Sequence, residues 1–135
     1  MNATLRERDL EVEAAWTPSP TRHRESGPAV AAIISAALGM ITLAVVNLGT
    51  AASKAFNEWV HGIGKLWMPG AEGIGPYSGK QTLSLLVWIG TWIVLHVALR
   101  SRDLNLGRWL IVFLVGTGIA TTLLWPPVFE YLAGH

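Results

Sequence analysis

The chain has 135 residues, of which 51% are hydrophobic and only 14% are charged, and its formal net charge is +1. Soluble domains carry charge on roughly a quarter of their residues, so this composition argues against a soluble globule. The near-neutral charge gives no reason to expect nucleic acid as a partner, and the absence of cysteine excludes disulfides, thiolate metal sites and a cysteine nucleophile.

Three long stretches of the chain contain no Asp, Glu, Lys or Arg: residues 26–53, 81–99 and 109–129. About 20 predominantly apolar residues are enough to cross the hydrocarbon core of a bilayer as a helix. The sequence therefore predicts an all-α integral membrane protein with three transmembrane helices.

The first part of the chain, residues 1–27, is a polar tail that mixes acidic residues with four arginines. Thr4 and Glu7 have the spacing of a capping box, which predicts a short helix here. No apolar core of a signal peptide precedes the first long apolar stretch. We expect this tail to lie in the cytoplasm.

The first transmembrane helix is predicted over residues 28–49. Small residues recur along it at three- and four-residue spacing: Ala32, Ser35, Ala36 and Gly39. Helices in lipid associate where small residues let their backbones approach closely. These four residues are therefore predicted to form a helix-packing surface.

Residues 50–81 are predicted to form an amphipathic helix followed by a loop rich in glycine and proline. Large apolar residues of the helix, among them Phe56, Trp59 and Trp67, fall on one side, and charged residues such as Lys54 and Lys65 fall on the other. This pattern is typical of a helix that lies in the membrane interface.

The rest of the chain is predicted to form two more transmembrane helices, the turn between them and a tail. We predict a second transmembrane helix over residues 82–99, a turn over 100–108, a third transmembrane helix over 109–125 and a C-terminal tail over 126–135. The short turn predicts that the second and third helices form an antiparallel hairpin. Asn105 is the expected N-cap of the third helix.

Basic residues near the helix ends predict the orientation. All seven arginines lie in the tail or in the turn over residues 100–108, whereas the three lysines lie on the opposite side. By the positive-inside rule, the tail and that turn are cytoplasmic and the amphipathic helix and C-terminus are periplasmic. A bacterial inner membrane is the expected location.

The strongest candidates for ligand-binding residues lie on the second transmembrane helix. Trp88, Trp92, His96 and Arg100 recur every four residues and so follow one stripe of a helix. An ionisable residue within such a helix usually faces protein or a cavity. The neutral imidazole of His96 could ligate the metal of a tetrapyrrole, either bacteriochlorophyll or haem, with Trp92 packed against the ring.

In that respect the stripe resembles the histidine of bacterial antenna polypeptides, although those have one transmembrane helix and no other antenna motif matches. A hydrogen bond from His96 to a neighbouring helix, or an extended side chain reaching the headgroups beside Arg100, is the favoured alternative. A tetrapyrrole cofactor is therefore possible but not favoured.

Trp88 lies near the middle of its helix, where lipid offers its indole N–H no acceptor. We expect it to face protein, either in helix packing, which we favour, or in contact with a cofactor or quinone. Four other tryptophans lie near the predicted membrane boundaries, as in an interfacial belt: Trp59, Trp67, Trp109 and Trp125.

Two further clusters are weaker candidates for binding sites, one for lipid and one for metal. Arg100, Arg102 and Arg108 could bind an anionic lipid such as cardiolipin, although membrane topology explains them as well. Glu58 and His61 have the spacing of a metal pair, but no third ligand lies nearby in the sequence, so no metal site is expected.

These features predict a small, non-catalytic accessory subunit of a larger membrane complex, of a respiratory or photosynthetic kind, that contributes helix packing and assembly. Its partners would be other integral membrane subunits and lipids. No paired charges within the predicted membrane helices suggest a proton relay. The alternatives are a tetrapyrrole-binding subunit that uses His96 and a stand-alone small oligomeric membrane protein.

Overall fold

The computed structural model describes residues 25–133, and all regular elements in that range are helices. Three of them are long: α2 (Gly27–Ala52), α5 (Tyr77–Leu99) and α6 (Leu106–Leu124). Three are short: α3 (Lys54–Lys65), α4 (Ala71–Ile74) and α7 (Pro126–Ala133). The predicted helix and the four arginines of the N-terminal tail lie outside the described residues.

The three long helices are long and apolar enough to cross a membrane. They contain 26, 23 and 19 residues. At 1.5 Å per residue they measure about 29 to 39 Å, against a hydrocarbon core of about 30 Å. For the residues that the structure describes, the prediction of an all-helical protein with three helices of this kind is therefore confirmed.

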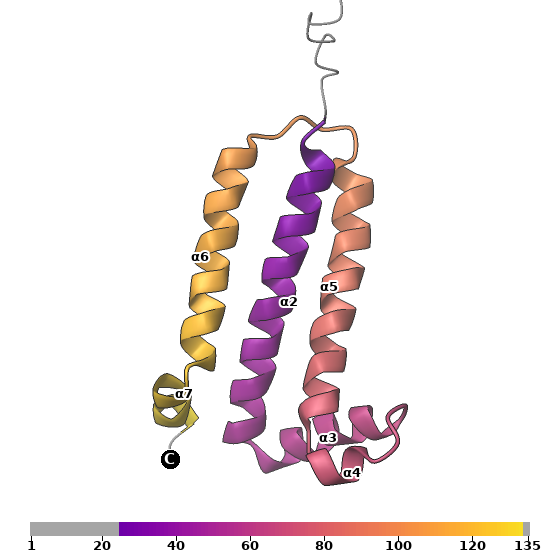
Figure 1. Ribbon diagram of the computed structural model, residues 1–135, viewed down its shortest axis with the longest axis vertical. Helices are drawn as coiled ribbons and strands as arrows, with labels where there is room; N and C mark the ends of the chain where they lie inside the picture. The colour runs from indigo at the N-terminus through magenta and orange to yellow at the C-terminus, as the bar shows by residue number, and fades with distance from the viewer. Residues whose placement is uncertain (1–24, 134–135) are drawn as a thin grey trace, which may run out of the picture.

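The long helices lie side by side in one layer with α2 in the middle (Figure 1). Within the described residues α2 packs against both α5 and α6, while no Cα atom of α5 lies within 8 Å of one in α6. The two outer helices run antiparallel, as the predicted hairpin requires, but α2 separates its arms. Most of the buried residues of the long helices consequently belong to α2.

Small residues allow α2 to pack closely on both sides. A Cβ atom added to Gly39 would lie 2.9 Å from Cβ of Trp88 in α5, and the Ser84 hydroxyl donates a hydrogen bond to the Gly39 carbonyl at 2.7 Å. On the other side, Gly116 of α6 faces Ala37. Backbones that approach this closely gain dispersion contacts along their length.

At the upper end in Figure 1, the start of α2 is bound to the turn between α5 and α6. The backbone N–H of Gly27 donates to the carbonyl of Arg102 at 3.0 Å. The Ser26 hydroxyl accepts a hydrogen bond from the backbone N–H of Leu104 at 2.6 Å. Asn105 caps α6 by accepting from the N–H of Arg108 at 3.1 Å, as its position predicts.

At the lower end, α3 crosses the first turn of α5 in backbone contact. Gly79 of α5 lies against the carbonyl of Val60, and Gly64 of α3 lies against Ser78. Side chains at either glycine would prevent this approach, so the two glycines fix the crossing point. The extra helical turn at the start of α5, from Tyr77, occupies part of the segment predicted as a loop.

The short helix α4 lies in the segment predicted as a loop, and α7 lies in the segment predicted as the C-terminal tail. Gly70 and Gly75 flank α4 with φ angles of 79° and 67°, a region that favours glycine. α7 begins at Pro126 directly after Trp125, which is extended and ends α6.

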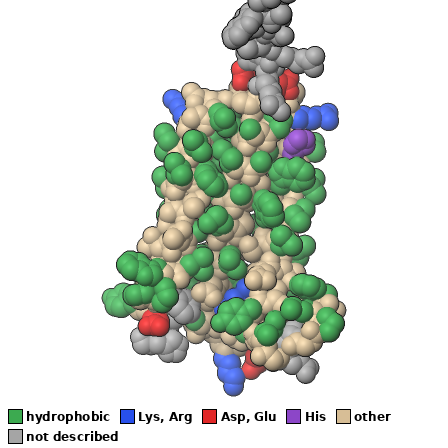
Figure 2. All heavy atoms as spheres, in the orientation of Figure 1, with side chains coloured by type: hydrophobic (Ala, Val, Ile, Leu, Met, Phe, Trp, Pro, Cys, Tyr) green, Lys and Arg blue, Asp and Glu red, His purple; other side chains and the backbone are tan. Residues whose placement is uncertain are grey.

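Hydrophobic side chains cover the long sides of the molecule, and charged side chains gather near its ends (Figure 2).

Candidate functional site

An apolar groove lies between α2 and α5, with a volume of about 770 Å³. α2 contributes the residues Ala36, Gly39, Met40 and Leu43. α5 contributes Gln81, Thr82, Ser84, Leu85, Leu86 and Trp88, and Trp67 comes from the segment that follows α3. The groove is therefore built by three separate parts of the chain.

The small residues of α2 make room for the groove. Gly39 has no side chain to fill the space beside Trp88, and Ala36 lines the groove one turn earlier. The hydrogen bond from Ser84 to the Gly39 carbonyl holds the two helices at this separation. A larger side chain at position 36 would occupy the groove.

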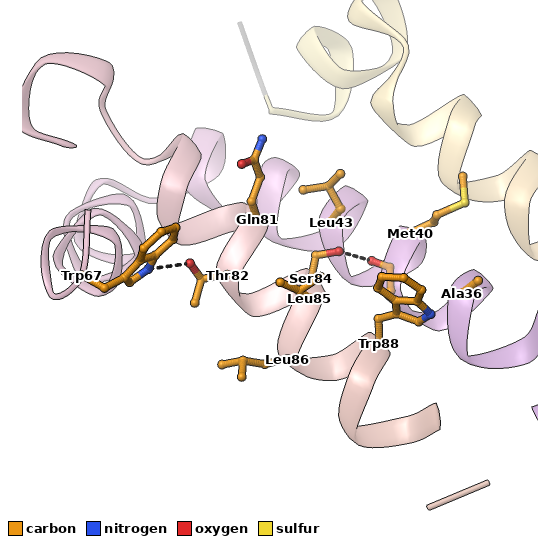
Figure 3. A pocket seen from close by; sticks show the side chains of 11 residues that line it. Ala36, Met40, Leu43, Trp67, Gln81, Thr82, Ser84, Leu85, Leu86 and Trp88 are labelled. Atoms are coloured by element: carbon orange, nitrogen blue, oxygen red, sulfur yellow. Dashed lines mark hydrogen bonds between the residues drawn. The ribbon is translucent and has the colours of Figure 1, made fainter. Parts of the chain in front are cut away.

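Two tryptophans stand at opposite ends of the groove (Figure 3). The indole N–H of Trp67 donates to the Thr82 hydroxyl at 3.0 Å, and that hydroxyl donates to the Ser78 carbonyl at 2.6 Å. These bonds hold Trp67 across the lower end. Gln81, near that end, and Trp88 are seven residues apart on α5, or about 10 Å along the helix axis.

Only two polar side chains of the groove are free of hydrogen bonds to other described residues. The groups of Thr82, Ser84 and Trp67 are used within the fold. The amide of Gln81 and the indole N–H of Trp88 have no such bond in the described part of the chain, and Trp88 is 44% exposed. The groove therefore offers an unused donor at each end.

The residues of the predicted stripe on α5 do not share one environment. Trp88 lines the groove, whereas Trp92 and His96 lie nearer the upper end and do not line it. The rings of Trp92 and His96 lie 5.6 Å apart at 44°. His96 makes no hydrogen bond to another described residue, so its imidazole is free to bind a ligand.

The other predicted site residues are spread along the chain. Arg100, Arg102 and Arg108 are exposed at the upper end. Of the four small residues on α2, Ala36 and Gly39 lie beside α5. Ser35 is buried and donates to the Ala32 carbonyl at 2.9 Å, while Ala32 is itself exposed.

A polar cluster at the lower end of the α2–α5 interface is absent from the sequence-based predictions. The ammonium group of Lys80 donates to the Asn47 side-chain oxygen at 2.7 Å and lies 5.2 Å from the centre of the Tyr77 ring. The amide of Asn57 in α3 donates to the Thr50 carbonyl at 3.3 Å. The signal in the sequence is Asn47, an amide within an otherwise apolar helix.

Nothing in the described part of the chain assembles a metal site, since no three residues of the types His, Cys, Asp or Glu come together there. Glu58 and His61 lie on α3 without a third ligand, and the Nε2 atom of His61 is buried with no hydrogen-bond partner in this part of the chain. The candidate site is therefore the groove, with Trp88 as its most distinctive residue.

Compared with models of known protein families, with curated proteins and with solved structures, the chain matches none of them.

Proposed function

We propose that the chain is an integral membrane protein whose three long helices cross the bilayer, and that it serves as a non-catalytic packing subunit of a larger membrane assembly. The exposure of the outer helices supports the membrane environment. In the most apolar 18-residue stretch of α5, 0% of the residues are buried, and in that of α6 the share is 6%. Leu86, Val94 and Ile111 are each more than 60% exposed. Water would penalise such a surface strongly, whereas lipid would not.

The observation that carries the role in assembly is the open layer of helices. A closed three-helix bundle buries one face of every helix, but here α5 and α6 lie on opposite sides of α2, and among the described residues no further helix closes the layer. Gly90 of α5 and Gly118 of α6 have open space where a Cβ would lie. Exposed glycines let a neighbouring helix approach closely, which favours protein over lipid at these positions.

The position of α3 supports its assignment to the membrane interface. Val60 and Gly64 face the long helices and are buried. The neighbouring apolar side stays uncovered, with Trp59 56% exposed, and the charged side carries Lys54 and Glu58, which are both exposed. Such a helix places its apolar side toward the acyl chains and its charged side toward water.

The distribution of the arginines supports the proposed orientation. Arg100, Arg102 and Arg108 gather at the upper end, opposite to α3 and α7. By the positive-inside rule, we infer that the upper end is cytoplasmic and the lower end periplasmic in a bacterial inner membrane.

Purification in mild detergent from the native membrane tests the subunit role. We expect other integral membrane proteins to co-elute in fixed proportion and to form cross-links with α5 or α6. Gly90→Leu and Gly118→Leu should each weaken this association at least tenfold, because they fill the open positions. Gly62→Leu, an equally open position on α3, is the matched control. Cross-links between copies of the chain alone would instead establish a stand-alone oligomer.

A second candidate, tetrapyrrole binding, is favoured by the unbonded imidazole of His96 beside Trp92. The absorbance of the same native preparation decides it. A Soret band that disappears in His96→Ala, while the assembly stays intact, would identify His96 as the ligand. If the variant keeps every chromophore, this candidate fails.

A further inference from the structure

We propose that the groove between α2 and α5 binds a lipid-soluble quinone, with a quinone carbonyl oxygen accepting a hydrogen bond from the indole N–H of Trp88. The inference rests on the proposal that α5 crosses the membrane. It depends on three properties of the groove: the depth of its unused donor, its limited length and its apolar walls.

The first property is the depth of Trp88. It lies 11 residues from each end of α5, Tyr77–Leu99, or about 16 Å along the axis. Its N–H makes no hydrogen bond to a described residue, and hydrocarbon offers no acceptor. The ester carbonyls of phospholipids lie outside the hydrocarbon core and cannot reach this depth. An acceptor at this depth would therefore belong either to another membrane helix or to a molecule that dissolves in the core, as a quinone does.

The second property is the length of the groove. A transmembrane helix packed along α2 and α5 would need a continuous path, but Trp67 crosses the lower end, held by its 3.0 Å hydrogen bond to Thr82. Only about 10 Å of α5 separates Gln81 from Trp88. The volume of about 770 Å³ lies within the range of ~300–1,000 Å³ that is typical of small-molecule sites. These dimensions suit a ring better than a helix.

The third property is the chemistry of the walls. Met40, Leu43, Leu85 and Leu86 surround the space between the two tryptophans, and no charged residue lines it. The groove is open along its outer side, so an apolar tail can leave it directly into the surrounding lipid. A few polar groups within an apolar pocket are the usual arrangement by which such sites orient a ligand, and here Trp88 and Gln81 supply them.

Titration of a short-tailed ubiquinone into the full-length chain in lipid nanodiscs tests the proposal. Size-exclusion chromatography first establishes that each variant enters the nanodisc, and empty nanodiscs give the background partitioning. We expect saturable binding, reduced about five- to tenfold in Trp88→Phe, which keeps an aromatic ring but loses the N–H. Trp92→Phe, one turn away and outside the groove, is the control and should bind as the unaltered chain does.

Filling the groove is the stronger test. Ala36→Leu should abolish saturable binding. If that variant fails to enter nanodiscs, Leu86→Trp, at a 63% exposed position of the wall, gives the same block. Binding no greater than to empty nanodiscs would overturn the quinone site, as would cross-linking from Leu86 to a partner helix that fills the groove. A chain that never enters nanodiscs would overturn the membrane proposal itself, so the two failures are distinct.

Discussion

Replacing Gly79 with alanine is expected to lower the free energy of unfolding by about 1–3 kcal/mol, the range for overpacking at a tight contact. The added Cβ would overlap the carbonyl oxygen of Val60. That oxygen belongs to the backbone of α3, so it cannot rotate away as the end of a flexible side chain could. The substitution would therefore push α3 off the first turn of α5.

Gly90→Ala is the matched control because Gly90 lies on the same helix with no atom within 4 Å of the added Cβ. Alanine favours a helix over glycine by up to about 1 kcal/mol, so this variant should be neutral or more stable. Thermal unfolding of the detergent-solubilised chain, followed by circular dichroism, compares the two. Equal stability of both variants would show that α3 does not cross α5 at Gly79.

Gly27→Ala is expected to open the upper end of the molecule, also at a cost of about 1–3 kcal/mol. The added Cβ would overlap the carbonyl oxygen of Leu99 and lie 2.9 Å from that of Arg102. The start of α2 must then move away from the turn. This movement would break the bond between the Gly27 N–H and Arg102, and that between Ser26 and the Leu104 N–H.

Hydrogen exchange at the Leu104 amide measures this opening directly. We expect faster exchange in Gly27→Ala and no change in Gly118→Ala, where the added Cβ meets open space on α6. A Leu104 amide that stays as protected in Gly27→Ala as in the unaltered chain would contradict the described contact between α2 and the turn.

The helical content and the three long apolar helices could be predicted because both depend on local sequence. Stretches without charge and long enough to cross a membrane mark α2, α5 and α6. The cap of α6 is equally local, since Asn105 bonds to an N–H three residues away. The short turn sets the antiparallel direction of α5 and α6. It does not determine which surfaces pack, so the central position of α2 was not predictable.

Tertiary contacts explain the helical segments that the sequence pattern missed. The first turn of α5 looks like part of a loop, but Gly79 packs on α3 and Lys80 bonds to Asn47. α7 begins with two prolines, which come directly after the predicted end of the third transmembrane helix at residue 125. Proline is also well suited to the first turn of a new helix, so the same residues end α6 and begin α7.

The candidate site was only partly predictable for a geometric reason. Residues four apart on a helix rotate by about 40° with each step, so a stripe turns gradually around the axis. Trp88 therefore lines the groove while His96, two steps later, lies outside it. Trp67 comes from another segment, and no local pattern connects it with Trp88.

The proposed membrane-spanning arrangement of α2, α5 and α6 is tested most directly by single-cysteine labelling, which suits a chain without cysteine. Ser101→Cys and Gly73→Cys place thiols at exposed positions at opposite ends, and Leu114→Cys places one within α6 at a 58% exposed position. In sealed vesicles, an impermeant maleimide should label positions 101 and 73 from opposite sides and leave position 114 unlabelled. Labelling of 101 and 73 from the same side, or rapid labelling of 114 from water, would contradict the arrangement.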